Sequence, residues 1–101
     1  MKRMYYAEYC EYGTNVSYDS MNGGAYDFYA FDSKKNRDEW IDTHEWDNYP
    51  SRTWAKSTRK AVEHCRGKEF SLVKVDEKRW ICCRKGTEYE VKMELDWHDI
   101  H

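Results

Sequence analysis

The sequence predicts an α+β domain, an antiparallel sheet of about five strands with two helices packed on one face, in the order ββααβββ. Three observations predict this class. Aromatic-rich segments open the chain, amphipathic helical patterns occupy its middle, and an alternating segment lies near its end. With 101 residues the chain has the length of a single domain, residues 1–101. Aromatic residues make up 17% of the chain, which is enough to build a core despite the high charge.

The first third of the chain predicts two strands. Residues 4–12 are dense in aromatic side chains, and residues 25–31, AYDFYAF, return as a second strand. Residues 13–24 between them are polar and hold clusters of glycine and asparagine, which indicate a turn and a loop. We therefore expect the two strands to pair antiparallel.

The middle of the chain predicts two helices. The first begins at a cap, Asp32 or Ser33, and ends near residues 46–48, because its apolar positions recur with helical spacing. The second begins at Ser51 and ends before Gly67, which stands where a C-cap glycine belongs.

The last third predicts a three-stranded meander over residues 69–75, 78–84 and 87–95, in which the third strand alternates strictly between apolar and charged residues. Two-residue turns would pair Val73 with Trp80, and that face would pack against the helices. A slip of one residue would exchange the two faces of a strand.

Charge is distributed unevenly along the chain. Acidic residues dominate residues 1–50, and basic residues dominate residues 51–85. An acidic first helix could meet a basic protein groove or imitate nucleic-acid phosphates, and a basic second helix could contact phosphates directly. A solvated surface of mixed sign is the alternative. The candidate partner-binding residues are Asp38, Glu39, Asp42, Glu45, Arg52, Lys56 and Arg59.

Motifs for catalysis are missing from the sequence. It contains no GxSxG elbow, Walker pattern or GxGxxG loop, and we therefore expect a protein that is not an enzyme and has no catalytic residues. Zinc is the one cofactor that the residues suggest, with Cys65, Cys82, His64 and Cys10 as ligands. The spacing fits no standard zinc motif, and the alternative is that the cysteines are small apolar core residues.

The sequence also bears on location. No run of apolar residues approaches the ~18 needed to span a bilayer, and the first residues lack the apolar region of a secretory signal. We therefore expect a cytoplasmic protein with reduced cysteines and no membrane partner.

One segment resembles a known group of proteins. Residues 26–65 are similar to small phage and prophage proteins in which a strand ending in Phe-Asp-Ser leads into a helix with Arg-Asp-Glu-Trp. The likeness is carried by Phe31, Asp32, Ser33, Arg37, Asp38, Glu39 and Trp40. This group includes anti-CRISPR proteins, some directed at Cas9. The resemblance implies a stoichiometric inhibitor in the host bacterial cytosol that binds a host protein or ribonucleoprotein complex such as a Cas nuclease. It assigns no site residues.

Overall fold

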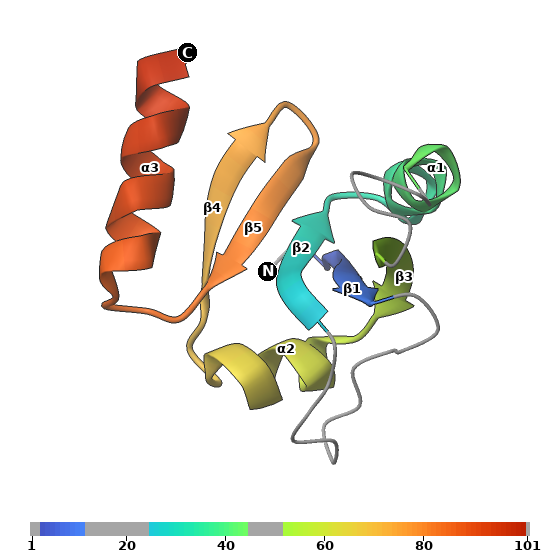
Figure 1. The fold of residues 1–101 in the computed structure, drawn as a ribbon, viewed down its shortest axis with the longest axis horizontal. Coiled ribbons are helices and arrows are strands. Elements are labelled where there is room, and N and C mark those ends of the chain that lie inside the picture. The colour runs from blue at the N-terminus through green and yellow to red at the C-terminus, as the bar shows by residue number, and fades with distance from the viewer. Residues whose placement is uncertain (1–2, 12–24, 45–51, 101) are drawn as a thin grey trace.

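The computed structural model describes residues 3–11, 25–44 and 52–100. Within these residues a five-stranded antiparallel sheet is combined with three helices (Figure 1). The elements are β1 (Tyr5–Glu11), β2 (Ala25–Phe31), α1 (Lys34–Thr43), β3 (Arg52–Ser57), α2 (Arg59–Arg66), β4 (Ser71–Asp76), β5 (Arg79–Cys83) and α3 (Glu88–Ile100). The α+β class and the strand number are confirmed, but the expected order ββααβββ is wrong and becomes ββαβαββα. The loop predicted over residues 13–24 lies outside the described residues.

The sheet has the strand order β3-β1-β2-β5-β4. The predicted pairing of β1 with β2 is confirmed, with Tyr5 opposite Phe31. On its other side β1 pairs antiparallel with β3, with Tyr6 opposite Ser57. The start of β1 therefore lies between the ends of β2 and β3.

The strand β3 corrects the prediction of a long second helix. Trp54 lies opposite Tyr9 of β1, and the two ring centroids are 5.1 Å apart. Trp54 is the one large apolar residue in residues 52–57, so the local pattern does not separate a helix from a strand. The free backbone groups along β1 decide the outcome, because pairing satisfies them.

Capping residues set the ends of the first two helices. Ser33 caps α1 as predicted and accepts a 3.1 Å hydrogen bond from the backbone amide three residues later. The helix ends at Thr43, before the predicted residues 46–48. Thr58, rather than Ser51, caps α2. The predicted C-cap at Gly67 is confirmed, with a φ of 97° that an L side chain rarely adopts.

The helix α3 replaces the third strand predicted over residues 87–95. Thr87 accepts a hydrogen bond of 3.4 Å from the amide of Glu90. The Glu90 carboxylate accepts bonds from the Ser71 hydroxyl and from the Gly86 amide. Thr-x-x-Glu is the sequence signature of a capping box, and Glu, Lys, Met and Leu favour helices. The apolar–polar alternation of this segment therefore gave the wrong prediction.

The register of the β4–β5 hairpin differs from the prediction by one residue. Val73 pairs with Ile81 instead of Trp80, and the pairing shifts between Lys74 and Asp76. The two-residue turn lies at residues 77–78 and not at 76–77, and the irregularity at Val75 leaves a net difference of one residue. As a result, Ile81 packs with Val73, and Trp80 packs on the opposite face of the sheet.

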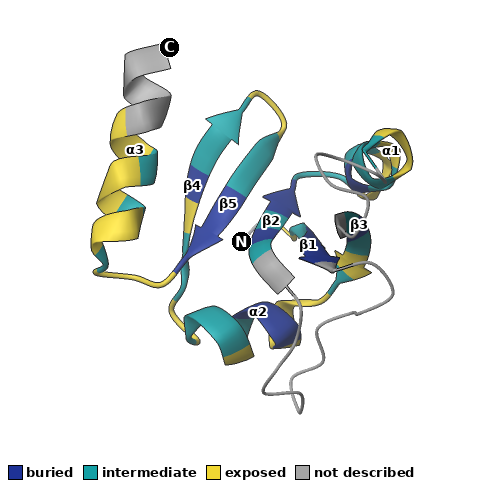
Figure 2. Cartoon of the chain, in the orientation of Figure 1, coloured by how far each residue is buried: buried dark blue, intermediate teal, exposed yellow. Residues whose placement is uncertain are grey.

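Helices cover both faces of the sheet, so the prediction of two helices on one face is wrong. The residues Ala61 and Val62 of α2 pack with Tyr6 and Phe28 on one face. On the other face, Trp40 and Ile41 of α1 pack with Ala7, Tyr9, Phe31 and Trp54, and Met93 of α3 packs with Val73, Ile81 and Cys83. Buried residues are therefore concentrated in the strands and in α2, while most of the described part of α3 is exposed (Figure 2).

Candidate binding groove

The predicted acidic residues of α1 are partly engaged by neighbouring cations. The Asp38 carboxylate forms a 3.0 Å salt bridge with Nε of Arg37. Desolvation opposes ionisation of Asp38, but the bond from Arg37 and the charges of Arg37, Lys56 and Lys34 outweigh it and lower the pKa of the carboxyl. Glu39 and Asp42 are exposed. Glu45 lies outside the described residues.

The predicted basic stripe is not a ridge on one helix. Arg52 and Lys56 belong to β3, and Arg59 opens α2. The side chain of Arg52 is not among those described. Arg59 donates from Nε to Glu63 at 3.1 Å, so this part of the guanidinium is engaged along the helix while the side chain stays exposed. These residues therefore belong to two elements and not, as the sequence predicted, to one helix.

The predicted zinc ligands are also divided. Cys65 and Cys82 belong to the same core cluster under α2, as expected, while His64 is exposed. Cys10 is fully buried and donates its S–H to the carbonyl of Thr53 at 3.8 Å. Within the described parts of the chain, no three His, Cys, Asp or Glu side chains are grouped so that they could hold a metal ion.

All four thiols are free and are held in their neutral form. Burial raises the pKa of Cys10 and of Cys83 to about 11 each, and nearby carboxylates add to the effect. Burial also raises the pKa of Cys65 and Cys82. A protonated thiol is a poor nucleophile and a poor metal ligand.

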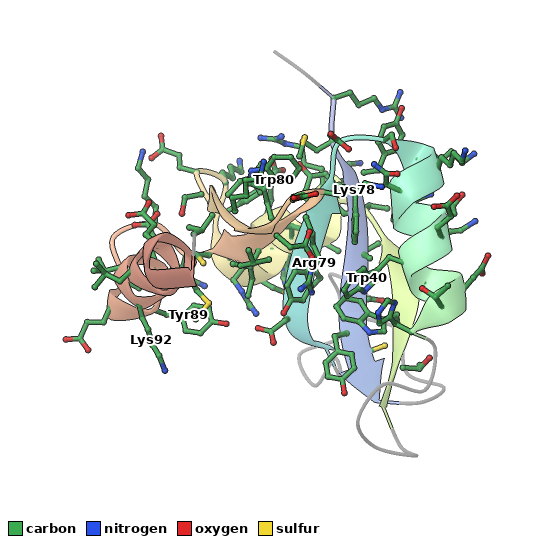
Figure 3. The ribbon with its side chains drawn as sticks, turned by 90° about the horizontal axis from the view of Figure 1, so that it is seen from above. Trp40, Lys78, Arg79, Trp80, Tyr89 and Lys92 are labelled. Carbon is green, nitrogen blue, oxygen red and sulfur yellow. The ribbon has the colours of Figure 1, made fainter. Side chains whose placement is uncertain are left out.

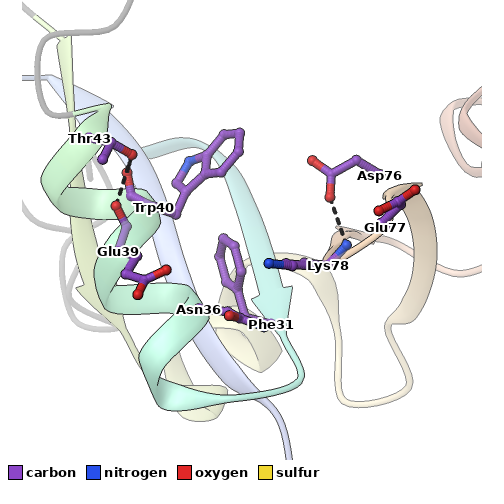
Figure 4. Close-up of a pocket in the computed structure, with 8 residues that line it drawn as sticks. All are labelled: Phe31, Asn36, Glu39, Trp40, Thr43, Asp76, Glu77 and Lys78. Carbon is purple, nitrogen blue, oxygen red and sulfur yellow. Dashed lines mark hydrogen bonds between the residues drawn. The ribbon is translucent and has the colours of Figure 1, made fainter.

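A groove of about 570 Å³ lies between α1 and the turn that joins β4 to β5 (Figure 4). Its floor is aromatic and consists of Phe31 and Trp40. Its rim is polar and consists of Asn36, Glu39, Thr43, Asp76, Glu77 and Lys78. We call this feature the acid-rimmed groove.

The floor of the acid-rimmed groove is held rigidly from several sides. The Trp40 ring stacks on His44 at 3.8 Å and meets Trp54 edge-on at 5.6 Å. The guanidinium of Arg79 lies 4.1 Å from the centroid of Trp40, where Figure 3 places the two side chains next to each other. The indole is therefore fixed before any ligand arrives.

The rim carries more negative than positive charge. Asp76 is bonded to Nε of Arg79 at 3.2 Å and accepts the amide of Lys78 at 2.9 Å. Glu39 and Glu77 are exposed on opposite sides of the groove, and Lys78 extends from the turn toward Phe31 (Figure 4). Two carboxylates are thus presented to solvent over an aromatic floor, a combination that suits a cationic side chain.

The sequence pointed to Glu39 but missed the other side of the groove. The sequence predicts only a turn at residues 76–77 and a strand from Lys78, and it places Trp40 on one face of the first helix. The sequence does contain a signal for this side of the groove. Asp76 and Glu77 form an acidic pair at a predicted hairpin turn, and a suitable strand order could bring this pair close to the acidic first helix. The crossover that places β5 beside β2 could not be read from local patterns.

Comparisons with known proteins give no match, whether with family profiles, curated proteins or solved structures. Among the helices in the described residues, none combines the length and apolar character needed to cross a bilayer.

Proposed function

We propose that the chain is a non-enzymatic binding protein whose acid-rimmed groove docks onto a basic protein surface. The single observation that carries this proposal is the placement of exposed Glu39 and Glu77 on either side of the Phe31 and Trp40 rings. His44 and Arg79 already cover the two faces of the Trp40 indole, so an arginine or lysine side chain entering the groove would pack beside this floor and pair with a carboxylate at the same time.

The aromatic floor supports binding more than a bare acidic patch would. Exposed salt bridges contribute little because water and ions screen them. A cation that is partly desolvated inside the groove is screened less, and the fixed indole loses little entropy when the cation binds beside it. The neutral, buried thiols are a further reason to place the working part of the chain on its surface.

The partner that the resemblance suggests is a Cas9-type nuclease loaded with guide RNA, inhibited by stoichiometric contact. Such a nuclease holds nucleic acid in a positively charged channel, which offers many arginine and lysine side chains. An acidic helix and an acidic turn on one rigid body would complement such a surface.

The test is a titration of guide-loaded Cas9 with the chain, read out as binding and as inhibition of DNA cleavage. A Glu39→Lys, Glu77→Lys double variant should bind about tenfold more weakly or worse, the factor that ~1.4 kcal/mol of lost interaction produces. The matched control reverses two exposed charges outside the groove, Glu69→Lys and Glu94→Lys, and should bind like the parent.

The two parts of the proposal fail separately. If the parent chain neither binds nor inhibits the loaded nuclease, the proposed partner is wrong. If both double variants lose affinity equally, general charge rather than the groove carries the binding.

A further inference from the structure

A second hollow, of about 490 Å³, is lined by Arg37 of α1 and by the starts of β1 and α2, and has the opposite character. Three arginines line it, Arg3, Arg37 and Arg59, together with Tyr5, Tyr6 and Ser57. None of its described lining residues carries a carboxylate. We call it the arginine pocket.

The topology of the sheet explains why these residues converge. Tyr5 pairs with Phe31 at the end of β2, and Tyr6 pairs with Ser57 at the end of β3. The helix α1 starts soon after β2 ends, and α2 starts directly after β3 ends. Both helices therefore begin at the same end of the strands, beside the start of β1. Their unpaired backbone N–H groups add positive potential to that of the arginines.

The Arg37 side chain is the least expected feature of the pocket. Only 9% of this residue is exposed, which is unusual for an arginine. Its Nε bonds Asp38 at 3.0 Å, and its guanidinium carbon lies 5.8 Å from the Tyr5 ring centroid. Among the described residues, the Arg37 side chain has no other hydrogen bond or ion pair. The bond to Asp38 uses Nε, so the two terminal nitrogens keep donors that a further anion can accept.

Of the other two arginines, Arg3 lies beside the same ring, whereas Arg59 reaches the pocket from α2, with its guanidinium 5.2 Å from the Phe70 ring centroid. The guanidinium of Arg3 lies 5.4 Å from the centroid of Tyr5, so the ring has an arginine near it on both the β1 and the α1 side. Arg59 is tethered through Nε to Glu63 and through Nη1 to the Tyr6 hydroxyl, 3.4 Å away. The hydroxyl of Ser57 is buried and has no hydrogen-bond partner among the described residues.

We propose that the arginine pocket binds a phosphate monoester group, carried by a nucleotide or by the 5′ end of a nucleic-acid strand. A phosphate monoester presents three oxygens and nearly two negative charges, and planar guanidinium groups pair with such oxygens in a bidentate way. The pocket is concave, which suits a terminal phosphate better than a diester in the middle of a strand. This inference does not depend on the acid-rimmed groove or on its partner.

The test uses the full chain and four probes, which form two matched pairs. One pair is adenosine monophosphate and adenosine, and the other is a short single-stranded oligonucleotide with a 5′-phosphate or a 5′-hydroxyl end. We expect the phosphorylated member of at least one pair to bind at least tenfold more tightly than its partner. Selective binding of the monophosphate identifies a free nucleotide as the ligand, and selectivity only between the oligonucleotides identifies a strand end.

Variants then locate the site. The double change Arg3→Gln and Arg59→Gln removes two exposed cations and should lower affinity for the phosphorylated probe at least tenfold, while Lys92→Gln on α3 should not. Arg37→Lys keeps the charge but loses the planar fork, and should also weaken binding if its melting profile stays native. The proposal is wrong if neither phosphorylated probe is preferred, or if Arg3→Gln/Arg59→Gln binds like Lys92→Gln.

Discussion

The guanidinium of Arg79 lies 4.1 Å from the centroid of Trp40, and this contact joins the first residue of β5 to the middle of α1. The same guanidinium lies 4.6 Å from the Tyr29 ring and donates from Nε to Asp76. Arg79 is therefore the point at which the β4–β5 hairpin, the centre of the sheet and α1 meet. It also fixes both the floor and the rim of the acid-rimmed groove.

Replacing Arg79 by alanine should destabilise the fold by about 1–2 kcal/mol, because a largely desolvated cation–π contact and its aliphatic packing are lost together. Chemical denaturation followed by tryptophan fluorescence measures this change. The control is Lys92→Ala on the exposed part of α3. Equal stability of the two variants would mean that the hairpin is not held to α1 through this residue.

Removing the cap of α3 should loosen that helix. The Thr87→Ala variant loses the hydroxyl that accepts the Glu90 amide and donates to the Arg84 carbonyl at 2.7 Å. N-cap deletions of this kind cost about 1 kcal/mol. Hydrogen exchange of the α3 amides measures the effect, and Thr87→Ser should retain most of the protection. Unchanged exchange in the alanine variant would contradict the capping role.

Because residues 52–57 form a strand paired with β1, the stability of the fold should depend on the packing of Trp54. The indole is 6% exposed and contacts the rings of Tyr9, Tyr29 and Trp40. Trp54→Ala should therefore cost about 3–5 kcal/mol, the range for deleting a buried large aromatic side chain. Trp54→Phe keeps a ring in the cluster and should cost clearly less. A loss below ~1 kcal/mol for the alanine variant would argue against this packing.

Local patterns predicted the parts of the fold that local physics decides. The β1–β2 pair, the Ser33 cap and the Gly67 terminus follow from residues that are neighbours in the sequence. The segment around Trp54 forms a strand because it pairs with the backbone groups of β1 that β2 leaves free, and this pairing is long-range in the sequence. The segment after Thr87 alternates like a strand, and the prediction rested on that alternation without using the Thr-x-x-Glu capping box.

Local sequence patterns predict even less of the candidate sites than of the fold. Glu39 could be selected from its place on an acidic helix, but Glu77 joins it only through the neighbouring positions of β2 and β5. Arg3 and Arg37 lie far apart in the sequence and meet because β1 starts where α1 begins. Side chains gathered by strand order cannot be grouped before the strand order is known.

The thiols should make the fold sensitive to alkaline pH. The pKa of Cys10 and of Cys83 rises from 9.0 to about 11 in the folded chain, mainly because burial penalises the thiolate. Between pH 9 and 11 the unfolded chain releases protons that the folded chain retains, so the unfolded state binds fewer protons and stability falls as pH rises. The loss is on the order of 2 kcal/mol for each thiol, and below pH 9 it disappears. Denaturation at pH 8, 9 and 10 measures it, and the Cys10→Ala and Cys83→Ala variants should each show a shallower decline.

The burial of the thiols also predicts the order in which they react. Half-buried Cys65 should react with Ellman's reagent at pH 8 before Cys10, Cys82 or Cys83. Rapid labelling of all four thiols in the folded chain, or a slope that the variants leave unchanged, would show that these cysteines are not held in the core as described.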